Sequence, residues 1–331
     1  MEDFRLNIKP DVTLLAILGP TAVGKTRVAI EISTSLDAEI ISVDSMQVYR
    51  GMDIGTSKPT EEERCSVPVH LIDVVDPGKS FSVALYKIMA EEAIAGIVSR
   101  GKKPLLVGGS GLYFRSVVDD LDFAHATPDV QTRKQIGPEL HEATSAELHS
   151  LLEQVDPKAA GEIPASNRRR VLRALEVARG GDRLASERQR SWTEYRSPYH
   201  LVVVGLEMDR GLLYRLIDAR IDNMISLGLE DEVKRLVKGG LAPGTTAGEA
   251  LGYKQMLAYL SGNTSRDKAI EEMKRRTRNY ARRQQTWFKR DPRIEWFRVE
   301  GSEGSRSEDI ENSLQGTARL VLEYITCKLE N

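Results

Sequence analysis

The clearest chemical motif in the sequence is a glycine-rich octapeptide near its start, GPTAVGKT, which matches the pattern G-x-x-x-x-G-K-[ST]. Glycines let the backbone wrap so that successive N–H groups and a helix N-terminus point at an anion. The lysine can neutralise a terminal phosphate, and the threonine hydroxyl can ligate Mg²⁺. We therefore predict a phosphate-binding loop formed by Gly19, Pro20, Thr21, Ala22, Val23, Gly24, Lys25 and Thr26.

The carboxylate best placed to act opposite this loop is Asp44, which follows the apolar run Glu39–Val43. Proteins that hydrolyse nucleoside triphosphates normally carry a second acid at the end of a strand, where it holds Mg²⁺. The apolar run Pro104–Val107 ends instead in Gly-Gly-Ser-Gly, without a carboxylate. Because the carboxyl ends of parallel strands share one edge of a sheet, we expect Asp44 to face the phosphate loop as a general base or a metal ligand. A helix-capping aspartate is the alternative interpretation.

A second glycine turn, Gly108–Tyr113 (GGSGLY), is expected at the same edge of the sheet. Alone this turn is a weak signal. Beside a phosphate loop, the Ser110 hydroxyl becomes a candidate partner for a pyrophosphate or for a substrate hydroxyl.

Arginine and lysine are concentrated in two segments. Residues 167–173 (NRRRVLR) contain four arginines, and residues 274–290 (KRRTRNYARRQQTWFKR) contain eight basic residues and no acid. Tyr280, Trp287 and Phe288 are interleaved with the second cluster, a mixture typical of surfaces that neutralise phosphates and stack on bases. We expect two basic helices that bind a folded RNA. A solvated helix face paired with acidic neighbours is the alternative.

Arg220 and Arg215 are candidates for a clamp on the phosphate site. On spacing alone, pairing with Asp218 or Asp222 on the helix surface is an equally good interpretation. The five histidines show no metal-ligand spacing, and we assign them no chemistry.

The elements that must position these residues follow from hydrophobic periodicity. Short apolar runs predict buried parallel strands, and apolar residues at three- and four-residue spacing predict helices. Their alternation argues for an α/β fold, with a parallel sheet flanked by helices. Strands are predicted at Leu14–Leu18, Glu39–Val43, Pro104–Val107, Leu201–Leu206 and Glu295–Val299, and helices at Thr26–Leu36, Phe81–Ser99, Leu212–Val237 with an interruption at Gly228, and Ser265–Lys289, followed by a polar linker and a final helix.

The middle of the chain lacks strand-like runs and is predicted to be helical. The expected helices are Gln131–Leu140, Ser145–Leu152, Arg169–Arg179 and Ala185–Glu194. We interpret this segment as an all-helical insertion between two strands of one sheet. The predicted domains are therefore a core of residues 1–114 and 200–331 and an insertion of residues 115–199.

Composition excludes several other classes of protein. The 331 residues carry 47 basic and 49 acidic side chains, so any affinity for nucleic acid must come from local clusters. Two distant cysteines cannot form a disulfide framework or a zinc site, and no signal peptide is recognisable. No apolar run approaches the 18 residues of a membrane span. We expect a cytoplasmic monomer with no obligate protein partner.

The motifs, taken together, resemble one protein family. GPTAVGKT, ISVDSMQVYRGMDIGTSKP, VHLIDVVDP, GGSGLY, NRRRVLRALEV, ALGYKQ and YARRQQTWF occur in this order. The combination resembles the bacterial tRNA dimethylallyltransferases, also called isopentenyl transferases. The similarity runs from about residue 12 to residue 299, and the DSMQVYRGMDIGT block is far more diagnostic than the phosphate loop.

This resemblance implies a P-loop NTPase-like fold and a specific reaction. The dimethylallyl group of dimethylallyl diphosphate would pass to N6 of adenosine 37 of tRNA, next to the anticodon, with release of diphosphate. The loop then holds diphosphate rather than ATP, which accounts for the missing second acid. The implied catalytic residues are Asp44, as the base for the exocyclic amine, and Lys25, Thr26 with Mg²⁺, Ser110 and Arg220 around the leaving group. The target base must leave its stack to reach a buried site.

The resemblance also implies contacts with tRNA and exposes two departures from the family pattern. Ser110 stands where threonine is usual. Leu216 stands where arginine is frequent, which leaves open whether Arg215 takes that role, since adjacent helix positions point about 100° apart. The zinc finger of eukaryotic relatives is absent. The implied tRNA-binding residues are Asp44, Ser45, Met46, Gln47, Ser110, Arg133, Arg169, Arg170, Val171, Leu172, Arg173, Gly252, Tyr253, Lys254, Arg282, Arg283, Gln284, Thr286 and Trp287.

Three other functions would use some of the same residues. A small-molecule or nucleoside kinase could combine the loop with Asp44 as base, but it would need neither the insertion nor the basic clusters. Prenylation of free AMP or ADP would keep the chemistry without RNA, and salt dependence separates the two because tRNA binding weakens steeply with salt. A non-catalytic RNA-binding protein would not need a phosphate loop that faces an acid.

Overall fold

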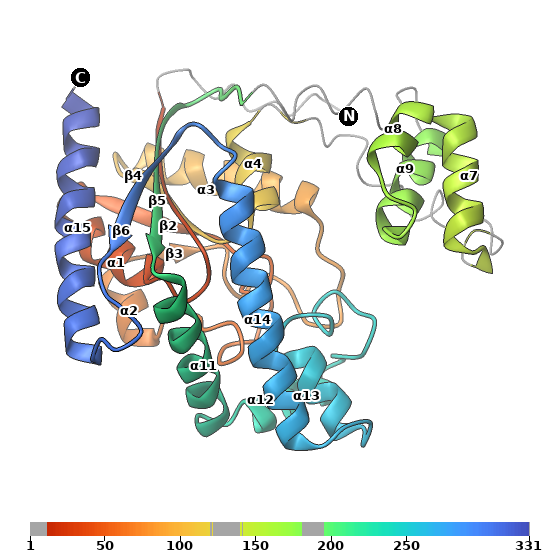
Figure 1. Ribbon diagram of the computed structural model, residues 1–331. Helices are drawn as coiled ribbons and strands as arrows, with labels where there is room; N and C mark the ends of the chain where they lie inside the picture. The colour runs from red at the N-terminus through yellow and green to blue at the C-terminus, as the bar shows by residue number, and fades with distance from the viewer. Residues whose placement is uncertain (1–11, 120, 122–139, 141, 181–194, 331) are drawn as a thin grey trace. The chain divides into compact units, whose positions relative to one another are not determined.

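The computed structural model describes residues 12–119, 121, 140, 142–180 and 195–330 (Figure 1). Its strands are β1 (Thr13–Leu18), β2 (Ala38–Val43), β3 (Val69–His70), β4 (Lys103–Gly108), β5 (His200–Met208) and β6 (Ile294–Val299). Its helices are α1 (Lys25–Leu36), α2 (Glu61–Ser66), α3 (Val83–Ser99), α4 (Gly111–Val118), α7 (Ser145–Val155), α8 (Pro157–Glu162), α9 (Arg168–Gly180), α11 (Arg210–Ser226), α12 (Leu229–Lys238), α13 (Tyr253–Leu260), α14 (Arg266–Phe288) and α15 (Ser307–Glu330).

In the described part of the chain, six strands form one sheet in the order β3-β2-β4-β1-β5-β6. Every neighbouring pair is parallel. The predicted α/β fold with a parallel sheet is therefore confirmed. The two-residue strand β3 escaped prediction because it is too short to show a period.

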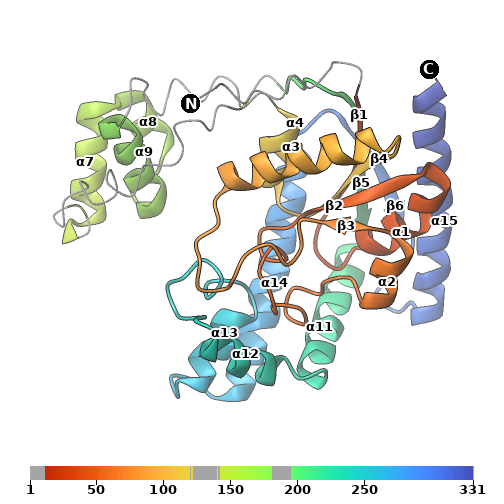
Figure 2. The ribbon, with the colours of Figure 1, turned by 180° about the vertical axis from the view of Figure 1, so that it is seen from behind.

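The sheet is covered on both faces, as its apolar strands require. In Figures 1 and 2 the strands lie between α1 and α15 on one side and α3 and α4 on the other. Strands β1, β2 and β4 are buried along almost their whole length. Helix α15 packs on α1, so the C-terminal helix lies behind the segment that follows the phosphate loop.

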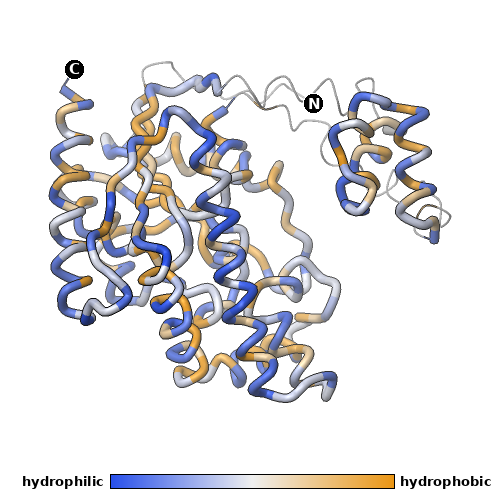
Figure 3. Tube along the Cα trace, viewed as in Figure 1, coloured by the Kyte–Doolittle hydropathy of each residue, from blue (hydrophilic) through white to orange (hydrophobic). Residues whose placement is uncertain are grey.

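The predicted helix over Leu212–Val237 is two helices, α11 and α12. The break falls at the predicted residue, Gly228, whose φ of 94° lies in the left-handed region that favours glycine. Ser265 is the N-cap of helix α14, and its side chain accepts a hydrogen bond from the backbone N–H of Lys268. Figure 3 shows α14 as mainly hydrophilic along its length.

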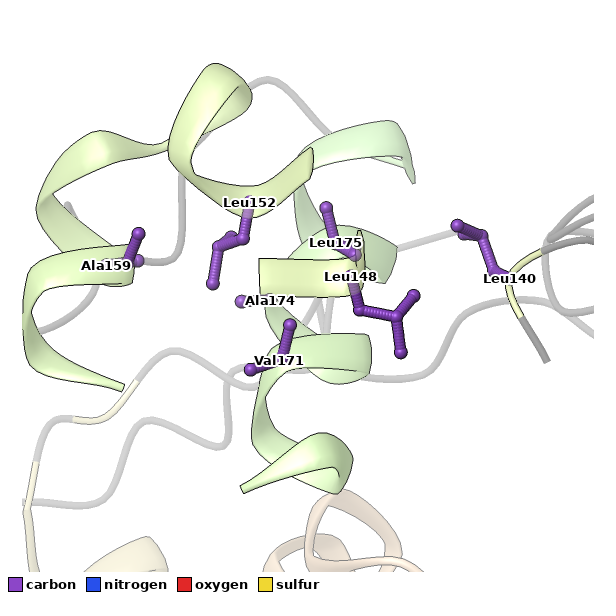
Figure 4. Close-up of a cluster of buried hydrophobic side chains, with 8 residues drawn as sticks. Leu140, Leu148, Leu152, Ala159, Val171, Ala174 and Leu175 are labelled. Atoms are coloured by element: carbon purple, nitrogen blue, oxygen red, sulfur yellow. The ribbon is translucent and has the colours of Figure 1, made fainter. Parts of the chain in front are cut away.

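The chain divides into two compact units, Met1–Val117 with Pro198–Asn331, and Val118–Ser197. In the second unit, α7, α8 and α9 pack around a small apolar core that includes Leu148, Leu152 and Val171 (Figure 4). Helices α7 and α9 are the predicted Ser145–Leu152 and Arg169–Arg179. Apart from Leu140, the predicted helices Gln131–Leu140 and Ala185–Glu194 lie outside the described residues. Within the described residues, no helix is long and apolar enough to cross a membrane.

Candidate active site

A cavity of about 390 Å³ opens where β1, β2 and β4 end. Its lining includes Lys25 and Thr26 of the glycine-rich loop, Asp44 after β2, Gly109 after β4 and Arg220 of α11. These residues come from distant parts of the sequence and meet because parallel strands end at one edge. The structure thus brings Asp44 and the phosphate loop into one cavity.

The glycine-rich loop has the backbone that a phosphate cradle needs. Gly19 and Gly24 have φ values of 150° and 96°. A Cβ at Gly19 would lie 2.6 Å from the Leu206 carbonyl oxygen, and one at Gly24 would lie 2.3 Å from a methyl carbon of Leu314. Lys25 Nζ donates to the Pro20 carbonyl at 2.6 Å. Both the positive φ values and the lack of room for a Cβ therefore favour glycine at these two positions.

The electrostatics of the cavity favour an anion. Burial, helped by the nearby positive charge of Arg220 and opposed by Asp44, lowers the pKa of Lys25 to about 7. Burial likewise lowers the pKa of Arg220, again against the effect of Asp44. Two partly buried cations beside a single carboxylate are costly without a ligand. A bound phosphate group would remove that cost.

The same cavity contains oxygen donors suited to Mg²⁺. The Thr26 hydroxyl and the Asp44 carboxylate are hard ligands of the kind that Mg²⁺ prefers. No cluster of three or more His, Cys, Asp or Glu in the described ranges could hold a metal by itself. The residues present therefore fit an ion that is shared with the phosphate oxygens of a substrate.

Asp44 is held by the turn that follows β2. Its Oδ1 accepts hydrogen bonds from the backbone N–H groups of Met46 and Gln47, at 2.8 and 3.3 Å. Both bonds use the same oxygen and fix the carboxylate in orientation. The carboxylate therefore caps a turn and lines the cavity; it caps no helix, so the helix-capping interpretation is wrong, and its role as base or metal ligand stays a prediction.

Ser110 is not part of the cavity lining but contacts Ser45, which is. Its Oγ accepts a hydrogen bond from the Ser45 backbone N–H at 3.2 Å. Ser110 also lies close enough to the Tyr280 phenol of α14 to act on its pKa, which it lowers. Burial, reinforced by the charge of Asp44, raises the pKa of Tyr280 to about 12, so this phenol stays protonated. Ser110 thus connects the Asp44 turn to α14.

The two clamp candidates on α11 face different surroundings. Arg220 lines the cavity, and its Nε donates to Ser57 Oγ at 2.8 Å. Arg215 donates to the Ser305 carbonyl at 2.5 Å and does not line the cavity. The sequence left open whether Arg215 takes the role of the arginine that is frequent at position 216. The geometry does not support this role, because Arg215 does not reach the cavity.

The two aspartates that might have paired with these arginines are bound elsewhere. Asp218 pairs with Arg278 at 2.6 Å, and Asp222 pairs with Lys274 at 2.7 Å. Both partners belong to α14. The surface pairing considered for Arg220 does not occur.

The Gln47 side chain forms hydrogen bonds to other groups of the protein with both of its amide atoms. Its Oε1 accepts from Ser42 Oγ at 2.8 Å, and its Nε2 donates to the carbonyls of Thr56 and Ser57 at 3.2 and 3.3 Å. Gln47 therefore ties the Asp44 turn to the loop that carries Ser57.

Gln284 is engaged in the same way. Its Oε1 accepts from the Thr21 backbone N–H at 2.9 Å, and its Nε2 donates to the Gly109 carbonyl at 2.9 Å. A Cβ at Gly109 would lie 2.1 Å from that nitrogen. The second glycine turn therefore needs glycine so that α14 can approach the phosphate loop.

Part of the cavity lining is apolar and was not identified from the sequence. It comes from one face of α11, from the segment before α13 and from α14. Its helical periodicity was visible, but periodicity does not distinguish a core face from a cavity wall. The apolar residues are Ile217, Ile221, Met224, Ala250, Leu251 and Met273.

The basic cluster of α14 is divided into two parts by its ion pairs. Arg275 and Arg276 share Glu272, at 2.7 and 2.6 Å. Lys274 and Arg278 are paired with α11, as described above, and Lys289 pairs with Glu207 at 2.6 Å. The surface-pairing interpretation is thus correct for these five side chains.

The remaining arginines of the cluster have no acidic partner in the part of the chain that the structure describes. No carboxylate within the described ranges pairs with Arg282, Arg283 or Arg290, and all three are exposed. With Thr286 and Trp287 they line a surface hollow of about 340 Å³. Arg283 also lies over the Tyr280 ring, 5.8 Å from its centroid. This hollow offers unneutralised positive charge beside an aromatic ring.

The other tRNA-binding predictions fall in different environments. Arg169 and Arg170 are exposed on α9, Leu172 is half-buried and Arg173 pairs with Glu176 at 2.7 Å. The side chains of Val171 and Tyr253 are buried and cannot touch RNA in this conformation. Lys254 is exposed and pairs with Glu249, Gly252 has a φ of 90°, and Ser45 and Met46 line the cavity. Arg133 lies outside the described residues.

The fold and the site define an α/β protein of the P-loop type whose glycine-rich loop shares a cavity with a carboxylate. The chain belongs to the IPP transferase family, whose model matches residues 47–291. The isopentenyl transferase model matches residues 12–73. A tRNA dimethylallyltransferase of Carboxydothermus hydrogenoformans is 47% identical over 284 residues, which cover 86% of this chain and 91% of that protein. One of Moorella thermoacetica is 47% identical over 292 residues, 87% of this chain and 90% of that protein.

Solved structures of the same kind share the fold. A tRNA isopentenylpyrophosphate transferase from Bacillus halodurans matches with a TM-score of 0.68 and 40% identity over 97% of each chain. A eukaryotic dimethylallyltransferase acting on tRNA matches with a TM-score of 0.72 and 25% identity, over 87% of this chain and 74% of that one.

Proposed function

We propose that this protein transfers the dimethylallyl group of dimethylallyl diphosphate to N6 of adenosine 37 in tRNA, in the cytoplasm. One observation carries the proposal. A single cavity is lined by Lys25 and Thr26 of the glycine-rich loop, by an apolar wall and by the carboxylate of Asp44. A kinase would need no apolar wall for the group that it transfers.

The leaving group is the diphosphate. As the allylic C–O bond breaks, the electron pair and the negative charge pass to the diphosphate oxygen. We expect Lys25 and Arg220, which line the cavity, to stabilise this charge together with N–H groups of the glycine-rich loop. The Thr26 hydroxyl would ligate Mg²⁺, which supplies further positive charge to the diphosphate when it is bound.

The nucleophile is the exocyclic amine of the adenine. Its nitrogen forms a bond to the allylic carbon and must lose one proton, which the Asp44 carboxylate accepts. Because this amine is a poor nucleophile, orientation supplies much of the rate. The two backbone hydrogen bonds to Asp44 Oδ1 provide that orientation for the base.

The apolar wall suits the five-carbon chain and keeps water from competing as acceptor. The target adenine must leave its stack to enter the cavity. Arg282 and Arg283 of α14, which no described carboxylate pairs with, would bind phosphates of the tRNA, and the exposed arginines of α9 offer separate positive charge for the same polyanion.

Removing the unpaired arginines should affect tRNA binding more than removing paired ones. We expect Arg282→Ala with Arg283→Ala to lower the slope of log K against log salt by about 2, because two phosphate contacts are lost. The matched double variant is Arg275→Ala with Arg276→Ala, two equally exposed arginines that share Glu272. It should change the slope far less. Equal effects in a filter-binding titration would contradict this division of the helix.

Diphosphate binding should depend on pH through Lys25. The pKa of about 7 means that the free amine predominates above pH 7, whereas the bound anion favours the ammonium. Affinity should therefore fall as pH rises through 7, by up to about tenfold per pH unit. Calorimetry with inorganic diphosphate at pH 6 to 8 measures this, with Lys25→Arg as control because arginine stays charged. An identical pH dependence in the two proteins would contradict the assignment.

The deciding experiment for the function is transfer of radiolabelled dimethylallyl from its diphosphate, with Mg²⁺, to unmodified tRNA and, in parallel, to AMP. Label in tRNA alone supports the proposal. Label in AMP would support dimethylallyl transfer but would reject tRNA binding by the arginines of α9 and α14. Phosphorylation from ATP without dimethylallyl transfer would establish the kinase.

A further inference from the structure

Glu232 of α12 is a buried carboxylate with an unusual set of partners. Its side chain is outside the cavity lining, and the residue is only 1% exposed. Its Oε2 accepts from the backbone N–H groups of Asp53 and Ile54, at 3.1 and 2.8 Å. Its Oε1 accepts from the Gly55 N–H at 3.2 Å and from the Tyr253 hydroxyl at 2.6 Å. Three consecutive N–H groups of one loop thus converge on one carboxylate.

This arrangement fixes the loop rather than a ligand. A buried carboxylate is tolerated only when its oxygens are hydrogen-bonded, and here four donors satisfy them. The loop also packs closely on the Tyr253 ring, because a Cβ at Gly55 would lie 2.5 Å from a ring carbon. Burial and the charge of Glu232 raise the pKa of Tyr253 well above its usual range, so its hydroxyl remains a donor.

The anchored loop leads directly into the cavity. Gly55, Thr56 and Ser57 line it. Ser57 Oγ accepts the hydrogen bond from Arg220 Nε, and the carbonyls of Thr56 and Ser57 accept from Gln47. Arg220 therefore takes its orientation from a loop whose opposite end is fixed by Glu232.

We propose that Glu232 is a positioning residue for the diphosphate: it holds residues 53–57 so that Ser57 directs Arg220 into the cavity, while Glu232 itself touches no substrate. The role of Glu232 in dimethylallyl transfer rests on the proposed function. The effect of Glu232 on diphosphate binding does not.

The test is Glu232→Gln, measured both by transfer kinetics and by calorimetric binding of inorganic diphosphate. Glutamine keeps the shape but turns an amide N–H₂ toward backbone donors. We expect kcat/KM for the prenyl donor to fall about 100-fold, mainly through KM, because the clamp is displaced by a fraction of an ångström to 1 Å. Diphosphate binding should weaken in parallel.

A double-mutant cycle with Arg220→Ala separates positioning from general stability. In the Arg220→Ala protein, adding Glu232→Gln should weaken diphosphate binding less than about threefold, because the residue through which Glu232 acts is gone. If the loss of diphosphate affinity in the double variant equals the product of the losses in the two single variants, the proposal is overturned.

The matched control is Glu39→Gln, the same change at another buried carboxylate, which pairs with Arg100 and His70 away from the cavity. It should lower the melting temperature and leave KM unchanged; a similar rise in KM would overturn the proposal.

If Glu232→Gln does not fold, Tyr253→Phe removes one of the four donors and should give a smaller rise in KM with the same dependence on Arg220. If Tyr253→Phe weakened diphosphate binding equally with and without Arg220, Glu232 would not act through Arg220. An unmodified protein that binds diphosphate but transfers no dimethylallyl group would reject the proposed function and leave the binding test of Glu232 intact.

Discussion

Replacing Asp44 with asparagine is expected to lower kcat for dimethylallyl transfer about 10³-fold, the usual contribution of a general base. Asparagine keeps an Oδ1 that can accept the hydrogen bonds from Met46 and Gln47, so the turn should persist. It cannot take the proton from the amine. Single-turnover transfer to unmodified tRNA gives the rate of the chemical step directly.

Binding measurements show whether this loss is specific to proton transfer. Asp44 is the carboxylate whose negative charge offsets the positive charges of Lys25 and Arg220. Its removal should therefore leave inorganic diphosphate bound at least as tightly as before. Full turnover in Asp44→Asn would reject the base assignment. Lost turnover together with lost diphosphate binding would point to a structural role instead.

The second large effect is expected from a pair of arginines on one helix. Arg220→Ala should lower kcat/KM for the donor between about 10²- and 10³-fold, the cost of losing one preorganised donor to a developing anion. Arg215→Ala should change it by less than about threefold, because that guanidinium donates to the Ser305 carbonyl outside the cavity.

Arg215 should instead contribute to stability. It connects α11 to the segment before α15, and its substitution removes a hydrogen bond from a partly buried position. Thermal unfolding should therefore show a lower midpoint for Arg215→Ala than for Arg220→Ala. Comparable losses of activity in the two variants would mean that both side chains reach the diphosphate.

Most of the sheet could be predicted from the sequence because its strands are buried on both faces and read as continuous apolar runs. The break at Gly228 was visible for the same kind of local reason, a residue suited to positive φ. Strand β3 was missed because two residues carry no periodicity, and its place at the edge depends on pairing with β2.

The site was predictable where a motif is local and was missed where partners are distant. The phosphate loop and Asp44 follow from residue types beside single strands. The neutralisation of Lys274 and Arg278 depends on α11, more than fifty residues away, which no local pattern reveals. Likewise, nothing in the sequence around Glu232 indicates that three N–H groups from residues 53–55 end on it.

The two hydrogen bonds of the Gln284 side-chain amide have a consequence for the affinities of the two substrates. Its two atoms join α14, which carries the unpaired arginines, to the phosphate loop and to the glycine turn after β4. Under the proposed function, we expect a tRNA that displaces α14 to displace the phosphate loop as well. Occupancy of the two substrate sites is then linked, and linkage is reciprocal: whatever factor tRNA adds to donor affinity, the donor adds to tRNA affinity. Gln284→Ala would uncouple the two affinities while leaving each site with all its charged side chains.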